Sequence, residues 1–587
     1  MAMRGGSREY MPTSMGSIKS LSPFCLRELI CLLQSLTILP YFTDSTSKIY
    51  KNSPFCCKME LSENNSINFV AEKGAMQMEN LFQWINSVLK FVGPLSDFFW
   101  DVPTMFHAYK SLPILGSFSL AIVLLMGSGI YFTLRLGFIQ VKGLPRAIRL
   151  MAHNKADMGI SPVAAFMLSS AMRVGPGNIL GVTGAISVGG PGAIFWMWVS
   201  GFFGMATAFV EGTLAQLFKE QKGREFVGGL PFYGSALLNG SSAIGIFLSG
   251  LYIFYALGCL PAQGYNVVSS LGTMAEIVTE SSIDTQSTFY YAAAAIVIGL
   301  TAILTFGGIR KVTKVTDRMV PVMAVIYVGT TLILIAVNLD SVPYFFRSVL
   351  EGAFTPAAIF GGTFGTVLVQ GVKRGLMSNE AGQGTITMSA AAADDNHPCE
   401  QGLLSALGVF LDTHIICTMT GFIVIMAHAW DKDPALWQDA GKLPKYLLSV
   451  SELVPTASFH AAVNFALTLC FCLFAYTCLV GMISFSEIAA ARMGKSQSLF
   501  ITVRVLALGV ALFGVLVNIA GYDLGNLWAF SDLANIILCY VNVPLLYRGF
   551  AYVLKSKEHF VSGSTEPFDG SIMGIHTPCW PRDSHKG

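Results

Sequence analysis

Val174-Gly-Pro-Gly-Asn178 stands near the middle of an apolar segment, residues 161–188, that is long enough to cross a lipid bilayer. Glycine relaxes the limits on φ and ψ, and Pro176 removes a backbone donor and clashes with the carbonyl four residues earlier, so we expect the helix to break here. Inside a membrane, broken backbone persists only where protein or a wet cavity satisfies its N–H and C=O groups. A half-helix N-terminus then favours an anion, and unwound carbonyls favour a cation. The pattern favours a carrier of a small zwitterion with a coupled cation. The alternative is a glycine-rich packing seam between ordinary helices.

The composition indicates a membrane protein. Of 587 residues, 53% are hydrophobic and only 12% are charged, whereas a soluble chain carries about 25% charged residues. The net charge of +2 gives no indication of a nucleic-acid partner. The twelve cysteines form no C-x-x-C pair, so we expect neither a disulfide framework nor a zinc site. Those in apolar runs should behave as small buried hydrophobes; they are Cys259, Cys417, Cys470, Cys472, Cys478 and Cys539.

Windows of about 20 residues identify eleven candidate spans and predict an all-α polytopic fold. We expect three parts: a poorly ordered N-terminal extension (1–75), a transmembrane domain (76–550) and a cytoplasmic tail (551–587). The extension is a degenerate signal sequence, a flexible tail or translation from too early a start, and we favour the last two. The spans cover residues 113–136, 161–188, 192–217, 242–270, 288–306, 319–338, 354–372, 402–428, 458–486, 501–519 and 524–547.

Lys and Arg residues predict the orientation of these spans. One set of alternate loops, in which we include Lys373 and Arg374, holds 20 basic residues, and the opposite set holds four. By the positive-inside rule the richer set is cytoplasmic. The N-terminus is then outside and the C-terminus is in the cytoplasm.

An internal repeat would explain the broken span. Carriers of this kind often contain two five-helix halves of inverted topology, each with a broken first helix. If the first span is an extra helix, the halves are spans two to six and seven to eleven, and span seven should also be interrupted. Span seven carries Gly361, Gly362, Thr363 and Gly365 near its middle, so we expect the second break there.

Five motifs resemble the alanine or glycine:cation symporter family. They begin at Arg173 (Arg-Val-Gly-Pro-Gly-Asn-Ile-Leu-Gly-Val), Gly189 (Gly-Gly-Pro-Gly-Ala-Ile-Phe-Trp), Lys373 (Lys-Arg-Gly-Leu-Met-Ser-Asn-Glu-Ala-Gly-Gln-Gly), Gly129 and Gly408. The resemblance covers about residues 80 to 550. It implies the LeuT-type inverted-repeat fold in a bacterial inner membrane. It also implies coupling to sodium, in some members to protons, and import of alanine, glycine or a similar small neutral amino acid.

The resemblance also implies roles for individual residues. The carbonyls of Ala171 and Val174 would face one sodium, while the Asn178 side chain and the Arg173 carbonyl would lie near the substrate carboxylate or a second ion. A Ser-Thr pair of the eighth core helix corresponds to Thr477 and Cys478, and sulfur is a poor ligand for a hard cation. Two further departures are Met482, where the family commonly has Trp, and Pro176, where it has Thr or Ser. The full set expected at the substrate is Gly175, Pro176, Gly177, Asn178, Gly361, Gly362, Thr363, Gly365, Cys478 and Met482, and that expected at sodium is Ala171, Val174, Thr477 and Cys478.

Acidic and polar residues within or beside the spans are further candidates for an ion site or a gate. Glu211 would pair with Arg173 or Arg374, or else cap lysines at the membrane interface. Asp412 and Thr413 would bind an ion, or hydrogen-bond to a broken helix. Asn379 and Glu380 would form an inner gate with an arginine, or lie in a solvated loop. His414 is a candidate proton relay, although packing is the commoner role of a single histidine on a helix.

A sodium-coupled symporter is the leading hypothesis, and two others remain. One is a proton-coupled or larger-substrate carrier of the same fold, which Cys478, Met482 and His414 suggest. The other is a passive channel. We find no metalloprotease, P-loop or nucleophile-elbow motif on a suitable element, so we expect neither an enzyme nor a cofactor. The expected partners are the amino acid, the ion and membrane lipid, and a monomer suffices.

Overall fold

A computed structural model of the chain describes residues 80, 82–112, 116, 118–152, 156–354, 363–432, 437, 441–522, 524, 526–563, 567–574 and 577–580. The contacts divide the chain into Met1–Leu81 and Phe82–Gly587, and the account below concerns the second unit. The extension predicted over residues 1–75 lies outside the described residues, as do Gly361 and Gly362.

The described chain is almost entirely helical, which confirms the all-α prediction for an integral membrane protein. Among the described residues, eight helices are long and apolar enough to cross a membrane. They are α11 (Ala193–Leu217), α13 (Ser242–Thr279), α14 (Thr288–Phe306), α15 (Ile309–Val337), the continuous segment of α20 (Pro398–Val409), η6 (Phe410–Cys417) and α21 (Thr418–Met426), then α25 (Ala457–Ala490), α26 (Gln497–Ile519) and α27 (Asn526–Ser562). A two-stranded antiparallel hairpin, β1 (Glu220–Lys222) and β2 (Glu225–Val227), follows α11.

Shorter elements lie where the remaining candidate spans were expected. The first candidate contains α5 (Leu120–Ile122), η3 (Val123–Gly127) and α6 (Ser128–Arg135). The second contains α9 (Pro162–Arg173), η4 (Gly177–Gly181) and α10 (Val182–Gly189). The seventh begins beside α16 (Val342–Phe354) and continues into α18 (Thr363–Asn379) and α19 (Thr387–Ala392). Two peripheral helices, α3 (Val92–Asp101) and α24 (Lys442–Leu453), complete the elements used below.

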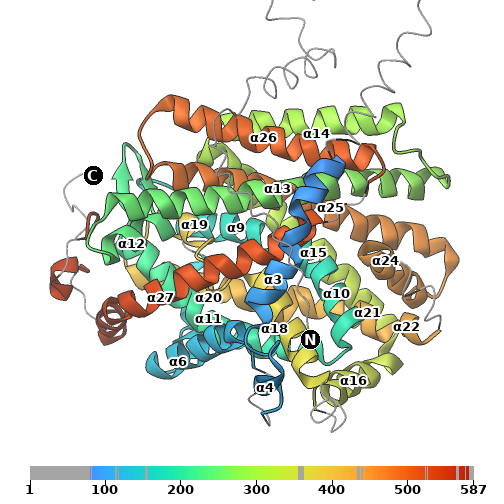
Figure 1. Cartoon of the computed structure of the whole chain (residues 1–587), viewed down its shortest axis with the longest axis horizontal. Helices are drawn as coiled ribbons and strands as arrows, with labels where there is room; N and C mark the ends of the chain where they lie inside the picture. The colour runs from blue at the N-terminus through green and yellow to red at the C-terminus, as the bar shows by residue number, and fades with distance from the viewer. Residues whose placement is uncertain are drawn as a thin grey trace, which may run out of the picture. The chain divides into compact units, whose positions relative to one another are not determined.

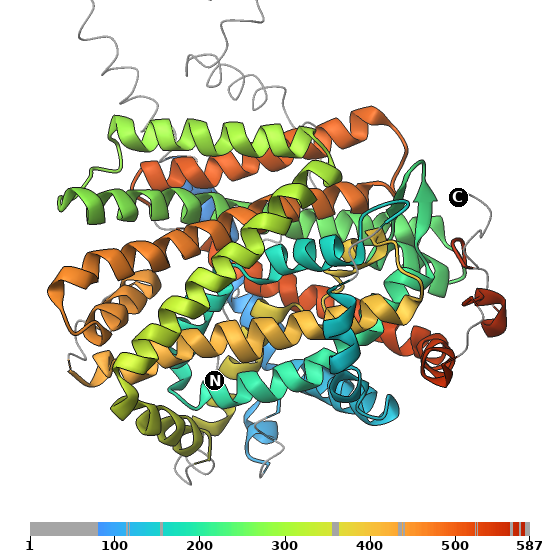
Figure 2. The same ribbon diagram turned by 180° about the vertical axis from the view of Figure 1, so that it is seen from behind.

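Helices distant in sequence pack side by side around the short elements. α13 packs along α25 and α26, and α3 lies across α27 (Figure 1). From behind, α11 and α20 run next to each other (Figure 2). α9 contacts both α15 and α25, while α10 contacts α18. The short elements are therefore enclosed by long helices, which is the arrangement that lets unwound backbone persist within an apolar protein.

The structure also bears on the predicted burial of the cysteines and on the boundary expected at residue 551. All six cysteines of the apolar runs are buried, as predicted for small hydrophobic residues. Helix α27 continues to Ser562, beyond the boundary expected at residue 551. After it, Phe568 and Trp580 are buried, and the Trp580 indole N–H donates to the Gln216 carbonyl at the end of α11 (2.8 Å).

Candidate functional site

The first helix break lies where the sequence predicts it. The Ser161 hydroxyl caps the start of α9, and the helix ends at Arg173. Val174 then has φ −75° and ψ 82°, outside the helical region, and helix resumes at Gly177 as a π-helical turn, η4. Short π-helical stretches occur often at functional sites.

The break frees two backbone carbonyls. In a continuous helix, the Gly175 N–H would donate to the Ala171 carbonyl, but here it donates to Asn178 Oδ1 (2.9 Å). Pro176 has no N–H, so the Met172 carbonyl also loses the donor that a helix would supply. These oxygens are hard ligands of the kind a small cation requires. Of the two carbonyls predicted at the ion, that of Ala171 is thus released by the break itself.

Asn178 connects this break to two other helices. Its Nδ2 donates to Asp412 Oδ1 on η6 (2.6 Å) and to Ser378 Oγ on α18 (3.0 Å). Ser378 in turn donates to Asp412 Oδ2, and the Thr420 hydroxyl donates to the Asn178 carbonyl (2.8 Å). Asn178 and Asp412 are almost completely buried. Of the two roles considered for Asp412, the structure shows the hydrogen bond to the broken helix.

Three members of this network were absent from the predicted site: Ser378, Cys417 and Thr420. Ser378 bridges Asn178 and Asp412, and the Cys417 sulfur lies 3.0 Å from Ser378 Oγ and 3.4 Å from Asn178 Nδ2. Ser378 precedes Asn379 and Glu380, which the sequence did single out, so it could have been found as part of the same polar run. Nothing in the sequence around Cys417 distinguishes it from the other apolar cysteines.

The second break that the structure describes follows α18, whereas the break predicted at Gly361 and Gly362 lies outside the described residues. Gly365 lies inside α18, and the helix continues to Asn379. The chain then leaves helical geometry over residues 380–386, with φ of 56°, 96° and 79° at Glu380, Gly382 and Gly384. Gly365 lies more than three turns before Ser378, about 20 Å at 1.5 Å per residue. Gly365 and Thr363, the residue that begins α18, are therefore remote from Ser378 along that helix, and their contact with the substrate stays a prediction.

Glu211 holds the second break in its shape. Its Oε1 accepts from the backbone N–H groups of Gly382 (3.1 Å) and Gly384 (2.8 Å), and from Asn542 Nδ2 (2.7 Å). Asn542 also donates to the Gly382 carbonyl (2.9 Å). Glu211 is fully buried, so the alternative of an interfacial cap is wrong. Asn542 was missed, because nothing in the sequence connects α27 with this loop.

The two breaks meet through Arg173 and Asn379. Arg173 Nε donates to the Asn379 carbonyl (3.2 Å), which joins the last residue of α9 to the last residue of α18. Asn379 Nδ2 donates to Thr413 Oγ1 (3.0 Å), and Thr413 donates to Asp412 Oδ2 (3.2 Å). Asn379 and Glu380 are buried, so the alternative of a solvated loop is wrong.

Helix α25 closes one side of the first break. A Cβ atom at Gly175 would lie 3.5 Å from Cys478 Sγ, so this cysteine contacts the break directly. Thr477 Oγ1 donates to the Leu473 carbonyl of its own helix (2.9 Å), and Met482 is buried one turn further along. The structure therefore brings Gly175, Asn178 and Cys478 together. His414, the candidate relay, lies with Nε2 3.1 Å from the Trp198 carbonyl.

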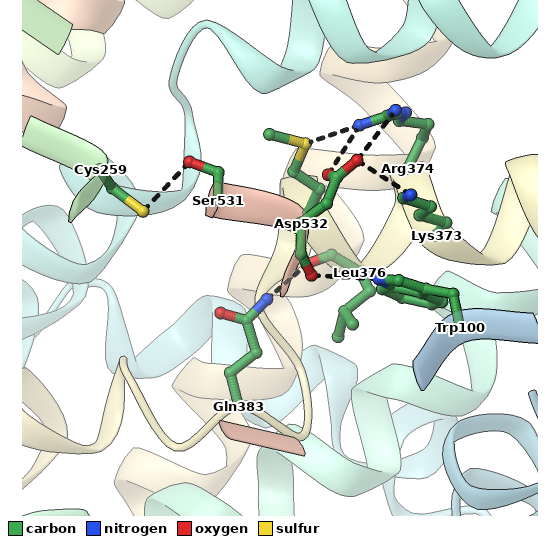
Figure 3. Close-up of polar contacts among 9 residues, drawn as sticks. Trp100, Cys259, Lys373, Arg374, Leu376, Gln383, Ser531 and Asp532 are labelled. Carbon is green, nitrogen blue, oxygen red and sulfur yellow. Dashed lines mark hydrogen bonds and ion pairs between the residues drawn. The ribbon is translucent and has the colours of Figure 1, made fainter. Parts of the chain in front are cut away.

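Lys373 and Arg374 do not lie in a loop, as the orientation argument assumed. Both are within α18 and pair with Asp532 of α27, with Lys373 Nζ 2.9 Å from Oδ2 and Arg374 Nη1 3.0 Å from Oδ1 (Figure 3). The Trp100 indole donates to the Asp532 carbonyl (3.0 Å), and Gln383 of the second break donates to the Leu376 carbonyl (3.2 Å). Asp532 is thus shared by two cations that hydropathy alone places outside the membrane, and it offsets one of their two charges. It also fixes α18 to α27 beside the second break.

The site brings together backbone oxygens, amides and carboxylates that can serve as binding groups. The described residues contain no group of three His, Cys, Asp or Glu side chains placed to hold a transition metal. What they contain is two interrupted helices, freed carbonyl oxygens, and buried carboxylates hydrogen-bonded by neutral side chains. In membrane carriers, interrupted helices with such groups form the sites of small solutes and their coupling ions.

Comparisons with known proteins agree with this description. A model of the sodium:alanine symporter family matches residues 105–566. The probable sodium/glutamine symporter GlnT of Bacillus subtilis (strain 168) is 32% identical over 469 residues, 79% of this chain and 93% of that protein. The sodium/alanine symporter AgcS of Methanococcus maripaludis is 38% identical over 311 residues, 52% of this chain and 67% of that protein. The putative sodium/proton-dependent alanine carrier protein YrbD of Bacillus subtilis (strain 168) is 29% identical over 512 residues, 84% of this chain and 98% of that protein.

Proposed function

Because the chain belongs to the sodium:alanine symporter family, we propose that it imports a small neutral amino acid together with sodium by alternating access. Family membership itself supports amino-acid transport coupled to sodium. Alanine, glycine or D-alanine is the substrate we propose, and a bacterial inner membrane is the location. The outer-facing N-terminus, the cytoplasmic C-terminus and a functional monomer are part of the same proposal.

One observation carries the proposal: the two helix breaks face each other across a buried hydrogen-bond network. Asn178 follows the first break, Ser378 precedes the second, and both contact Asp412. A carrier must let two halves of the protein move around a fixed site, and interrupted helices supply both the binding groups and the hinge points. This pairing also supports eleven spans in a LeuT-type 5+5 inverted repeat with one extra N-terminal helix.

For the ion, we propose a sodium site beside the first break. The Ala171 carbonyl is released from helical bonding, and the Val174 carbonyl lies in the unwound residues. Thr477 supplies a hydroxyl on α25, the helix that contacts the break through Cys478. Because sulfur is a poor sodium ligand, we assign Cys478 to the wall of the site and leave the ion to oxygen atoms.

For the substrate, we propose that the residues around the first break set its size. Gly175, Pro176 and Gly177 expose backbone groups to the amino-acid head, and Asn178 orients them. Cys478 and Met482 are buried on the facing helix and leave an apolar wall for a short side chain.

Transport in proteoliposomes tests the proposal. With an inward sodium gradient, we expect accumulation of labelled alanine above equilibrium, and competition by glycine and D-alanine. Replacement of external sodium by choline should abolish accumulation. Uptake that never exceeds equilibrium would instead identify a passive channel.

A second candidate is a proton-coupled or larger-substrate carrier of the same fold. Cys478 in place of a hydroxyl ligand favours a site less suited to sodium, and His414 offers a titratable group on the π-helical segment that carries Asp412. Accumulation that follows an inward proton gradient without sodium would support proton coupling. Competition by glutamine stronger than competition by glycine would support the larger substrate.

A further inference from the structure

Arg173 has buried hydrogen-bond donors that the described protein does not satisfy. Its side chain is 2% exposed, and its Nε donates to the Asn379 carbonyl (3.2 Å). Nη1 and Nη2 have no hydrogen-bond partner among the described residues. A guanidinium carries five donors in a planar fork and keeps its charge, so leaving two of its nitrogen atoms unpaired in a protein interior is costly.

The surrounding backbone is shaped to receive this group. A Cβ atom at Gly408 of α20 would lie 1.9 Å from Arg173 Nη1, so any side chain at that position would displace the guanidinium. The absence of a side chain at Gly408 therefore allows Arg173 to lie against α20. Both residues lie in regular helices, Arg173 at the end of α9 and Gly408 within α20, so the helix packing fixes their relative position.

Three buried carboxylates lie within electrostatic reach of Arg173, and Glu380 acts on it most strongly, before Asp412 and Glu211. Each of the three accepts hydrogen bonds from neutral donors. Among the described residues, Arg173 forms no ion pair with any of these three carboxylates. One guanidinium and three carboxylates thus share the region between the breaks without a direct pair.

Glu380 is the best placed of the three to become that pair. It follows Asn379, whose carbonyl Arg173 already contacts, and its φ of 56° makes it the first residue of the second break. Among the described residues, the Glu380 carboxylate accepts one side-chain hydrogen bond, from Thr385 Oγ1 to Oε2 (2.6 Å). By contrast, Glu211 Oε1 and both Asp412 oxygens accept hydrogen bonds that hold the breaks together. A change in the backbone at residue 380 can therefore bring the two groups together without breaking the Asn178 network.

We propose that Arg173 is a tethered cation, which pairs with Glu380 when the carrier reorients without its cargo. The inference rests on the proposed function and adds to it a residue for the return step. In a symporter, the empty carrier must move its site back across the membrane, and uncompensated buried carboxylates oppose that movement. An arginine that takes up the negative charge only when the coupling ion has left favours the return.

Arg173→Gln separates the return step from the rest of the cycle. With sodium and alanine on both sides, exchange of labelled for unlabelled alanine does not require the empty carrier to move. Relative to the wild type, we expect net sodium-driven uptake of the variant to fall at least about tenfold further than its exchange rate does. Arg347→Gln, on an exposed residue paired with Glu351, is the matched control and should change neither rate.

Two further variants keep the test decisive. In Arg173→Gln combined with Glu380→Gln both charges are absent, so we expect net uptake to recover to within about threefold of the wild type. Gly408→Ala retains Arg173 but displaces its guanidinium, and it should lower net uptake more than exchange. If Arg173→Gln is not recovered as a folded, monodisperse protein, Gly408→Ala decides the question.

Equal loss of exchange and net uptake, or a double variant as slow as the single one, would overturn the inference and leave Arg173 a structural residue. Unchanged net uptake in Arg173→Gln would also overturn it. These results are distinct from failure of the proposed function, which would show as the absence of sodium-driven accumulation in the wild-type protein.

Discussion

The backbone N–H groups at the two helix breaks find their hydrogen-bond acceptors in different parts of the chain. At the first, Gly175 donates to the side chain of Asn178, three residues further along the same segment. At the second, the backbone of Gly382 and Gly384 donates to Glu211, 171 and 173 residues earlier in the chain. The Gly175 amide of the first break is therefore satisfied locally, whereas the Gly382 and Gly384 amides of the second are satisfied by a distant side chain.

This difference has a mechanical consequence. A break that satisfies its own backbone can keep its shape while neighbouring helices move. A break held by side chains of α11 and α27 keeps its shape only while those helices stay in place. We therefore expect the second break to be the more sensitive of the two to remote substitutions.

Glu211→Ala should have the largest effect. It leaves the backbone N–H groups of Gly382 and Gly384 without their acceptor and removes one acceptor of Asn542. Each buried unsatisfied group costs about 1–3 kcal/mol. We expect loss of alanine uptake and a thermal unfolding midpoint well below that of the wild type. Glu225→Ala, on the exposed hairpin, is the control. Wild-type uptake by Glu211→Ala would refute the tertiary support of the second break.

Asp532→Asn should have the next largest effect, because it removes the shared partner of Lys373 and Arg374. Removing one member of a buried ion pair costs about 3–5 kcal/mol, and these side chains are only 10–14% exposed. The matched control is Glu452→Gln, which removes an exposed partner of Lys432 and should cost about 0–1 kcal/mol. Detergent-based thermal unfolding measures both. Similar losses of stability in the two variants would argue against a buried ion pairing of Asp532 with Lys373 and Arg374.

Asn178→Ala should abolish or strongly reduce uptake with a smaller loss of stability. The substitution removes the donor to Asp412, a hydrogen bond to a charged group worth about 1.5–3 kcal/mol, or roughly ten- to a hundredfold in rate. Membrane insertion should be normal, because it depends on hydropathy. Asn338→Ala serves as the control, since Asn338 bonds only backbone carbonyls of Leu334 and Leu453. Undiminished alanine uptake by Asn178→Ala would remove this residue from the site.

A pair of glycine substitutions gives the smallest and sharpest comparison. Gly384 has φ 79°, where a side chain costs about 1–2 kcal/mol, and a Cβ there would lie 3.1 Å from Asn542. Gly175 needs no left-handed geometry, and its Cβ would make an ordinary 3.5 Å contact with Cys478. We therefore expect Gly384→Ala to lower the unfolding midpoint more than Gly175→Ala does. The reverse order would mean that the first break is the less tolerant one.

The same contrast explains what the sequence could predict. The first break has all its determinants within five residues, so Gly-Pro-Gly and the following Asn178 were enough to place it. The second break follows Lys373 and Arg374, and a hydropathy window ends the span before such a pair. Their shared partner Asp532 lies 158 residues away from Arg374. A hydropathy window of about 20 residues therefore cannot reveal the ion pairing that holds both cations inside the protein.

The residues of the candidate site also differ in whether the sequence or only the packing of helices could identify them. Asp412 and Asn379 were found as polar residues within or beside apolar spans, and Arg173 and Asn178 were found through the family resemblance. The structure connects all four. Glu211 was found in the same way as Asp412, but its attachment to Gly382 and Gly384 required the packing of α11 against the second break. Asn542 was not found, since one amide on a long helix carries no local signal.

The burial of the cysteines makes this protein suitable for labelling from water. In the described part of the chain every thiol is buried except Cys579, which is partly exposed. Once Cys25, Cys31, Cys56, Cys57 and Cys579 are replaced by serine, a membrane-impermeant maleimide should react only with cysteines introduced at chosen surface positions. Engineered thiols at Glu225 and at Glu452, tested in intact cells and in inverted vesicles, would then report directly which side of the bilayer each end of the helices faces.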